Sequence, residues 1–116
     1  MTALHTLSVS EVTEGIRRRE FSPMDVVEAC LARIEALEPQ LQAWVTLDRE
    51  GALTAAQRCA EAVQRGNATG PLTGLPVGLK DIIYTAGMRT TAGSRVYANF
   101  VPTYDATVAI RLKQAG

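Results

Sequence analysis

The feature that most constrains this chain is a run over residues 70–81, GPLTGLPVGLKD, in which one lysine follows an apolar stretch. The glycines and prolines of its first half cannot continue a regular element. The second half predicts a strand over residues 77–83, with Lys80 among apolar neighbours. Because an ammonium group is costly to remove from water, a lysine in a buried strand needs a chemical reason.

Two interpretations of Lys80 follow from these surroundings. Desolvation disfavours the charged form, so a neutral amine could act as a general base and activate a serine nucleophile. Gly78, two residues earlier on the same face of the strand, would leave room for a substrate or another backbone. Alternatively, Lys80 extends from a strand end into solvent or pairs with a carboxylate such as Asp81. Local chemistry alone favours this second, structural interpretation.

Composition excludes several classes of protein. The 116 residues suit one small domain, and a hydrophobic fraction of 47% is enough for a core. The 12 basic and 12 acidic residues cancel, which argues against a nucleic-acid partner. The N-terminus resembles no signal peptide, and no apolar run is long enough to predict a membrane span. Cys30 and Cys59 lack the spacing of a metal site, so we expect two reduced cysteines in a cytoplasmic protein.

Apolar residues at helical spacing predict three helices before the glycine-rich run. The first covers residues 8–19, with Ser8 or Ser10 as its cap and an apolar face formed by Val9, Val12 and Ile16. The second begins with the cap Ser22, Pro23 and a capping-box partner, Asp25, and we expect it to end at Glu38, before Pro39. The third runs from the cap Asp48 to about Arg65.

The remaining segments suggest an α/β arrangement. Residues 41–47 alternate with period two and predict a short strand, in which Trp44 is a packing anchor. Asp105 is expected to cap a last helix whose apolar side holds Val108, Leu112 and Ala115. This helix is typical of a crossover between parallel strands, and no return strand follows it. The pattern therefore predicts part of a larger α/β domain.

Three spaced motifs carry a resemblance to a known family. They are GPLxGxPVxxKD over residues 70–81, AGMxTTAGS over residues 86–94 and YDAT over residues 104–107. In this order they resemble the amidase signature family, and the helix that opens with Ser22 and Pro23 fits the same resemblance. The likeness covers essentially the whole chain and is most specific over residues 70–107.

The resemblance implies a fold and an activity. Family members are hydrolases of carboxylic amides built as one α/β/α domain around a mixed sheet, and they need no metal or cofactor. Residues 1–116 would be the N-terminal part of that domain, with an incomplete sheet. They would comprise a helical part (8–66), a turn with the lysine-bearing strand (70–84), and a loop with a crossover helix (85–116).

The resemblance also implies a catalytic role for Lys80. In the family, a serine nucleophile, a second serine held by a cis peptide bond and a lysine form the catalytic triad, and Lys80 corresponds to the lysine. The two serines belong to a glycine- and serine-rich segment that residues 1–116 do not contain. We therefore expect the chain alone to be inactive. Ser94 lacks a nucleophile elbow and is expected to shape a loop, and Asp81 to accept loop N–H groups or to support catalysis.

Three functional hypotheses remain. The first is a free-standing amidase that acts on a small carboxamide. The second is the ammonia-producing A subunit of a glutamyl-tRNA amidotransferase, which releases ammonia from glutamine and works with partner subunits. Such proteins more often have Asn after Lys-Asp and Cys after the Thr pair, so Ile82 and Ala92 favour the first hypothesis. The third is a non-catalytic association module that forms a homodimer or pairs with the rest of the domain.

Overall fold

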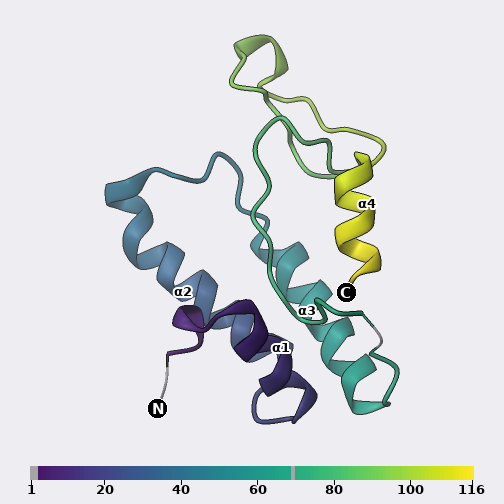
Figure 1. The fold of residues 1–116 in the computed structure, drawn as a ribbon. Helices are drawn as coiled ribbons and strands as arrows, with labels where there is room; N and C mark the ends of the chain where they lie inside the picture. Colours follow the sequence, from purple (N-terminus) through teal and green to yellow (C-terminus); the bar gives the residue numbers. More distant parts are fainter. Residues whose placement is uncertain (1–2, 69) are drawn as a thin grey trace.

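The computed structural model describes residues 3–68 and 70–116, and its regular elements are helical (Figure 1). In chain order they are η1 (Leu4–Thr6), α1 (Val9–Arg17), α2 (Pro23–Leu41), α3 (Arg49–Gln64), η2 (Arg95–Tyr97) and α4 (Thr107–Gln114). Across the described ranges, β pairing is limited to an isolated bridge between Thr85 and Met88. The strands predicted over residues 41–47 and 77–83, and the mixed sheet they would join, are therefore not formed in this chain.

Reciprocal side-chain caps start the first two α-helices, at Ser8, one of the two predicted caps of the first helix, and at Ser22, the predicted cap of the second. The hydroxyl of Ser8 accepts the N–H of Glu11 at 3.2 Å, and the Glu11 carboxylate accepts the N–H of Ser8 at 2.7 Å. Ser22 and Asp25 repeat the arrangement at 3.1 and 2.8 Å, with Pro23 as the first helical residue of α2. These pairs satisfy N–H groups that the first turn of a helix leaves without partners.

The end of α2 differs from the prediction, because the helix continues through Pro39 to Leu41. A proline in a helix removes one i→i−4 hydrogen bond, and here only Gln40 and Leu41 remain in the helix after it. Gln42 then adopts a left-handed conformation and donates its N–H to the carbonyl of Glu38 at 2.9 Å. The Glu38 carboxylate accepts the N–H groups of the next two residues, one of them Trp44 at 2.9 Å. Glu38 thus closes the helix that Pro39 was expected to end.

Two buried apolar clusters hold the helices together, and α2 contributes to both. The first cluster contains Val12 and Ile16 of α1 and Val26 of α2. The second contains Val27 and Leu31 of α2 and Ala56 of α3. Val9 was expected on the same face as Val12, but it is 55% exposed at the first residue of α1, beyond the area that the core covers. Figure 1 shows α2 and α3 side by side, with α1 at the lower end of α2.

The first half of the glycine-rich run closes the end of α4. The N–H of Leu72 donates to the carbonyl of Ala115 at 2.8 Å, and the N–H of Gly74 donates to that of Gly116 at 3.3 Å. A Cβ atom on Gly70 would lie 2.0 Å from the Ala115 carbonyl oxygen, so only glycine allows this approach. Residues 70–74 therefore supply donors to carbonyl groups that a helix terminus cannot satisfy itself.

Gly74 also lies against the first apolar cluster. It is buried, has a φ of +83°, and a Cβ atom there would lie 2.6 Å from Ile16 Cδ1 and 3.0 Å from Pro23 Cγ. Both the conformation and the space therefore demand glycine. This residue connects the α1–α2 core to the loop that closes α4.

Helix α4 starts without the predicted cap. Its N-cap is Ala106, and no side chain accepts a hydrogen bond from its first turn. The Asp105 carboxylate instead accepts the N–H of Ala86 at 2.7 Å and pairs with Lys113 at 2.7 Å. The apolar side also differs, because Ala109 is buried whereas Val108 is 47% exposed.

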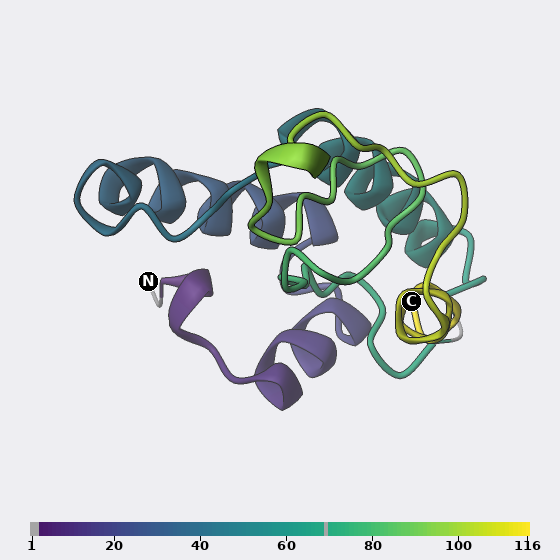
Figure 2. The same ribbon diagram turned by 90° about the horizontal axis from the view of Figure 1, so that it is seen from above.

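The chain is extended for its mass. Its Cα radius of gyration is 14.9 Å, against about 13 Å for a compact domain of this length. Its accessible area is 8014 Å², against about 6,200 Å² for a folded monomer of similar mass. Figure 2 shows α1 and α4 at separate edges of the molecule. In the described part, no helix combines the length and apolar character that crossing a membrane requires. Large apolar side chains that remain exposed include Leu41, Val45, Leu47, Val77, Ile82, Val96, Val101, Tyr104, Val108 and Ile110.

Candidate active site

Lys80 lies on the surface of the chain, at the end of an irregular segment that follows Leu75. The residue is exposed, and the carbonyl of Lys80 accepts the N–H of Ile83 at 3.0 Å, which turns the chain away. The premise that Lys80 is buried in a strand is therefore wrong for this chain. A strand needs a neighbour for its backbone groups, and none of the described residues pairs with residues 77–79.

Asp81 anchors the segment that carries Lys80 to the Thr-rich loop. Its carboxylate accepts the N–H of Thr91 at 2.8 Å and also the Thr91 hydroxyl, while its carbonyl accepts the N–H of Ala92 at 2.8 Å. The expectation that Asp81 accepts loop N–H groups is confirmed. This contact fixes the backbone one residue after Lys80.

The same contacts change the acidity of Asp81. The hydroxyl and the N–H of Thr91 hold the pKa of the Asp81 carboxyl below its usual value of 3.8, and the N–H of Gly93 and the charge of Arg89 add to this effect. A carboxyl whose pKa is lower in the folded state stabilises the fold above its unfolded pKa. That contribution disappears as the pH falls through the folded pKa.

A Thr91→Val exchange is therefore expected to weaken the acid sensitivity of the fold. Between about pH 5 and pH 2, the unfolding temperature of the variant should fall by less than that of the original chain. The reason is that Asp81 of the variant no longer accepts a hydrogen bond from the hydroxyl of residue 91. Thermal unfolding followed by circular dichroism measures this difference. Thr54→Val, on the exposed side of α3, is the matched control and should leave the pH dependence unchanged. Equal acid sensitivity of the Thr91→Val variant and the original chain would contradict the assignment.

Other side chains of the AGMxTTAGS motif shape its loop. Thr90 is buried and donates its N–H to the Phe100 carbonyl at 2.9 Å. Ser94 caps η2 by accepting the N–H of Val96 at 3.2 Å, so its predicted loop role is confirmed.

Arg89 joins this loop to the linker between α2 and α3. Its guanidinium donates to the Val45 carbonyl at 3.0 Å, to the Thr46 hydroxyl at 3.2 Å and to the Ala98 carbonyl at 3.0 Å. Sequence reasoning missed this residue, because two of its three acceptors are backbone carbonyls, which every residue carries.

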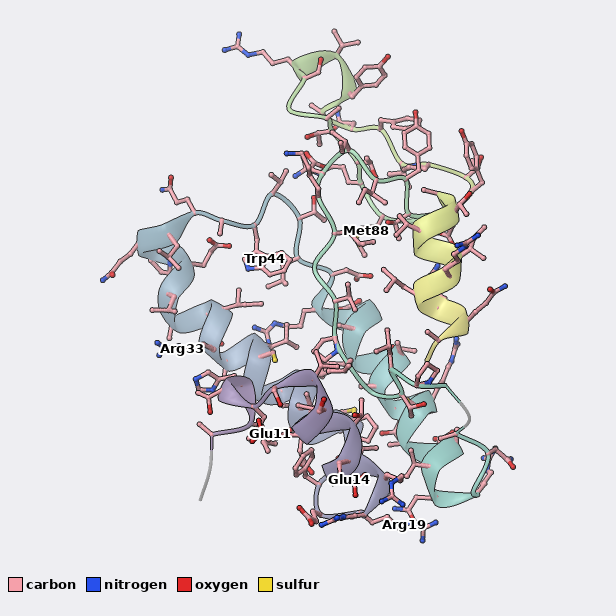
Figure 3. The ribbon with its side chains drawn as sticks, in the orientation of Figure 1. Glu11, Glu14, Arg19, Arg33, Trp44 and Met88 are labelled. Carbon is pink, nitrogen blue, oxygen red and sulfur yellow. The ribbon has the colours of Figure 1, made fainter. Side chains whose placement is uncertain are left out.

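Trp44, in the same linker, contacts the segment that carries Lys80. A Cβ atom on Gly78 would lie 2.9 Å from Trp44 Cη2, so the indole edge packs directly on this glycine. Figure 3 shows the Trp44 side chain between α2 and that segment. The predicted packing role is confirmed, although the side chain keeps 41% of its surface exposed. The open space expected beside Gly78 is taken by the indole.

Comparison with known proteins decides the family. The sequence model that describes the amidase family matches residues 25–116, a range that includes the three motifs and Lys80. The chain belongs to the amidase family. The resemblance inferred from the motifs is thereby confirmed.

Relatives within the amidase family agree with this assignment. The chain is 48% identical over 113 residues to the A subunit of the glutamyl-tRNA(Gln) amidotransferase from Carboxydothermus hydrogenoformans, covering 97% of this chain and 23% of that protein. It is 49% identical over 116 residues to the protein of that name from Chloroflexus aggregans, covering 100% and 24%. The chain thus spans about a quarter of the length of these relatives.

A solved structure shares the fold. It is described as an inhibitor-bound vestigial protein complex that reveals the evolutionary origins of an s-triazine catabolic enzyme. The match has a TM-score of 0.90 at 32% identity and covers 95% of this chain and 24% of that one. The helical arrangement described above therefore also occurs in a solved structure.

Other parts of the molecule do not add to the Lys80 region. A hollow of about 740 Å³ lies between η1, α1 and the start of α2, and its lining includes neither Lys80 nor Asp81. Within residues 3–68 and 70–116, no three side chains of His, Cys, Asp or Glu gather as a metal site would require. Cys30 and Cys59 are free and half-buried, and burial raises the pKa of both thiols.

Proposed function

We propose that this chain forms part of a larger α/β amidase domain and supplies Lys80 as the base in hydrolysis of a carboxylic amide. The observation that carries the proposal is the match of the amidase family across residues 25–116. It is supported by the GPLxGxPVxxKD motif over residues 70–81, whose lysine is Lys80. The large accessible area and the exposed apolar side chains fit a chain on which further polypeptide packs.

The proposed reaction assigns one proton transfer to Lys80. A serine from the rest of the domain attacks the amide carbonyl, and its proton passes through a second serine to the neutral amine of Lys80. The proton then returns from Lys80 through the second serine to the substrate nitrogen, the carbon–nitrogen bond breaks, and the nitrogen leaves as ammonia or an alkylamine. Water then hydrolyses the acyl-enzyme, with Lys80 again neutral and able to accept a proton. Lys80 is exposed here, and covering polypeptide would exclude water from it.

A second candidate is production of ammonia from glutamine for a partner enzyme. Relatives at 48% and 49% identity are named as the A subunit of a glutamyl-tRNA(Gln) amidotransferase, which favours this alternative. Ile82 and Ala92, at positions where such proteins more often have Asn and Cys, favour a free-standing amidase. The two candidates share the chemistry at Lys80 and differ in the amide and in the partner.

A chimera tests the proposed function. The 116 residues of this chain replace the matching segment of the Chloroflexus aggregans relative, to which they align over their whole length. We expect the folded chimera to release ammonia from glutamine or from a simple carboxamide, and either result supports the chemistry at Lys80 that the two candidates share. The isolated chain should release none, because it lacks the serine-rich segment. A folded chimera without activity on any amide, or an active isolated chain, would contradict the proposal.

A further inference from the structure

We propose that Arg89 is the positioning residue for Lys80, acting through the linker between α2 and α3. The inference rests on the proposed role of Lys80 as a base, and it concerns how the chain fixes the place of that lysine. It starts from an apparent contradiction. Lys80 is exposed and its segment has no strand partner among the described residues, yet a base must be held to a fraction of an ångström.

Two contacts fix the backbone on either side of Lys80. On the N-terminal side, the edge of the Trp44 indole packs on Gly78, where even a methyl group would lie 2.9 Å from Cη2. On the C-terminal side, the Asp81 carboxylate and carbonyl hold the N–H groups of Thr91 and Ala92, each at 2.8 Å. Lys80 is therefore held between two anchor points that belong to different parts of the chain.

Arg89 connects these two anchor points. It lies two residues before Thr91, and its guanidinium holds the Val45 carbonyl and the Thr46 hydroxyl, directly after Trp44. The contacts therefore form a closed ring that runs from Gly78 to Trp44, through Arg89 to Thr91, and back through Asp81 to Lys80. A third hydrogen bond, to the Ala98 carbonyl at 3.0 Å, fixes the direction of the Arg89 side chain.

Only an arginine fits this place well. The planar guanidinium carries five N–H donors in a fixed fork, and here it serves three acceptors in two segments. The linker is also supported by the Glu38 carboxylate, which accepts the Trp44 N–H at 2.9 Å. Without Arg89, the Glu38 hydrogen bond would still hold the linker to α2. The position of Trp44 relative to the Asp81 anchor point would, however, no longer be fixed.

The composition of the chain offers a direct test. The sequence contains two lysines, Lys80 and Lys113, and one tryptophan, Trp44. Isotope-labelled lysine therefore gives two assignable backbone amide signals by NMR, and fluorescence reports on Trp44 alone. In the 116-residue chain, Arg89→Gln should shift the Lys80 signal and the Trp44 emission, while the Lys113 signal stays in place.

Matched variants separate positioning from general destabilisation. Arg95→Gln removes the same charge from an exposed residue of η2 and should move neither Lys80 nor Trp44. Thr46→Val removes one acceptor of Arg89 at a site 34 positions from Lys80 in sequence, and should shift the Lys80 signal in the same direction by less. If the Arg89→Gln variant does not fold, the Lys80 signal of the Thr46→Val variant tests the proposal instead. An unmoved Lys80 signal in a folded variant of either kind would overturn the proposal.

The chimera adds a readout that depends on catalysis. Misplacement of a base lowers the rate of the chemical step more than it weakens substrate binding. Arg89→Gln should therefore lower kcat by about 10- to 100-fold while KM changes little. A chimera that is inactive even with Arg89 would count against the proposed function. The NMR result on the isolated chain would still decide the role of Arg89.

Discussion

Exchange of Lys80 for arginine in the chimera is expected to lower kcat for ammonia release by about a thousandfold, within the range of roughly 100- to 10,000-fold typical of general bases. Arginine has nearly the length of lysine, but its guanidinium does not lose a proton at any pH at which proteins function. The variant therefore removes the proton-accepting step and places a permanent cation where the proposed mechanism needs a neutral amine. Steady-state assays of ammonia release on the purified proteins measure the effect.

Lys113→Arg is the control for this experiment. Lys113 is the second lysine of the chain and pairs with Asp105 at 2.7 Å, a contact that arginine can also form. Its exchange should leave kcat within about twofold, since surface ion pairs contribute little. Wild-type kcat in a folded Lys80→Arg chimera would rule out Lys80 as the base.

Exchange of Gly74 for alanine is expected to lower the free energy of unfolding of the chain by about 2–4 kcal/mol. The new Cβ atom would lie 2.6 Å from Ile16 Cδ1, in the buried cluster that joins α1 and α2. The backbone would also have to hold alanine at a φ of +83°. Urea unfolding followed by circular dichroism measures the loss.

Gly66→Ala isolates the steric part of that loss. Gly66 has a similar φ of +74° after α3, but nothing lies within 4 Å of the place where its Cβ would be. Its exchange should lower the free energy of unfolding by about 1–2 kcal/mol, which is the cost of the backbone conformation alone. The interpretation of Gly74 fails if both variants lose the same stability.

The sequence predicted those parts of the fold that depend on neighbours a few residues away. Ser22, Pro23 and Asp25 predict the start of α2, because a capping box is formed by side chains three positions apart. The cap of α3 by Asp48, which accepts the N–H of Gly51 at 3.0 Å, was predictable for the same reason. The family was also predictable, since three motifs occur in a fixed order.

The features that sequence reasoning missed depend on distant neighbours. The alternating residues 41–47 and 77–83 have the pattern of strands, but a strand forms only where a partner satisfies its backbone. Asp105 has the residue type of a helix cap, yet Ala86 and Lys113 are its partners. Arg89 shows no pattern at all in the sequence. In each of these cases the deciding partner lies well beyond the next turn of the chain.

The loop over residues 70–74 has a consequence for the order in which the molecule assembles during synthesis. The buried residues of both clusters belong to α1, α2 and α3, so these helices can begin to pack while later residues are still being made. Leu72 and Gly74, by contrast, meet Ala115 and Gly116 across a separation of roughly forty residues, and such contacts form at a higher entropic cost. The segment that holds Lys80 starts directly after this loop. Thr91 and Arg89, which hold this segment in place, are synthesised later than the segment itself. The position of Lys80 is therefore set only once these later residues have left the ribosome.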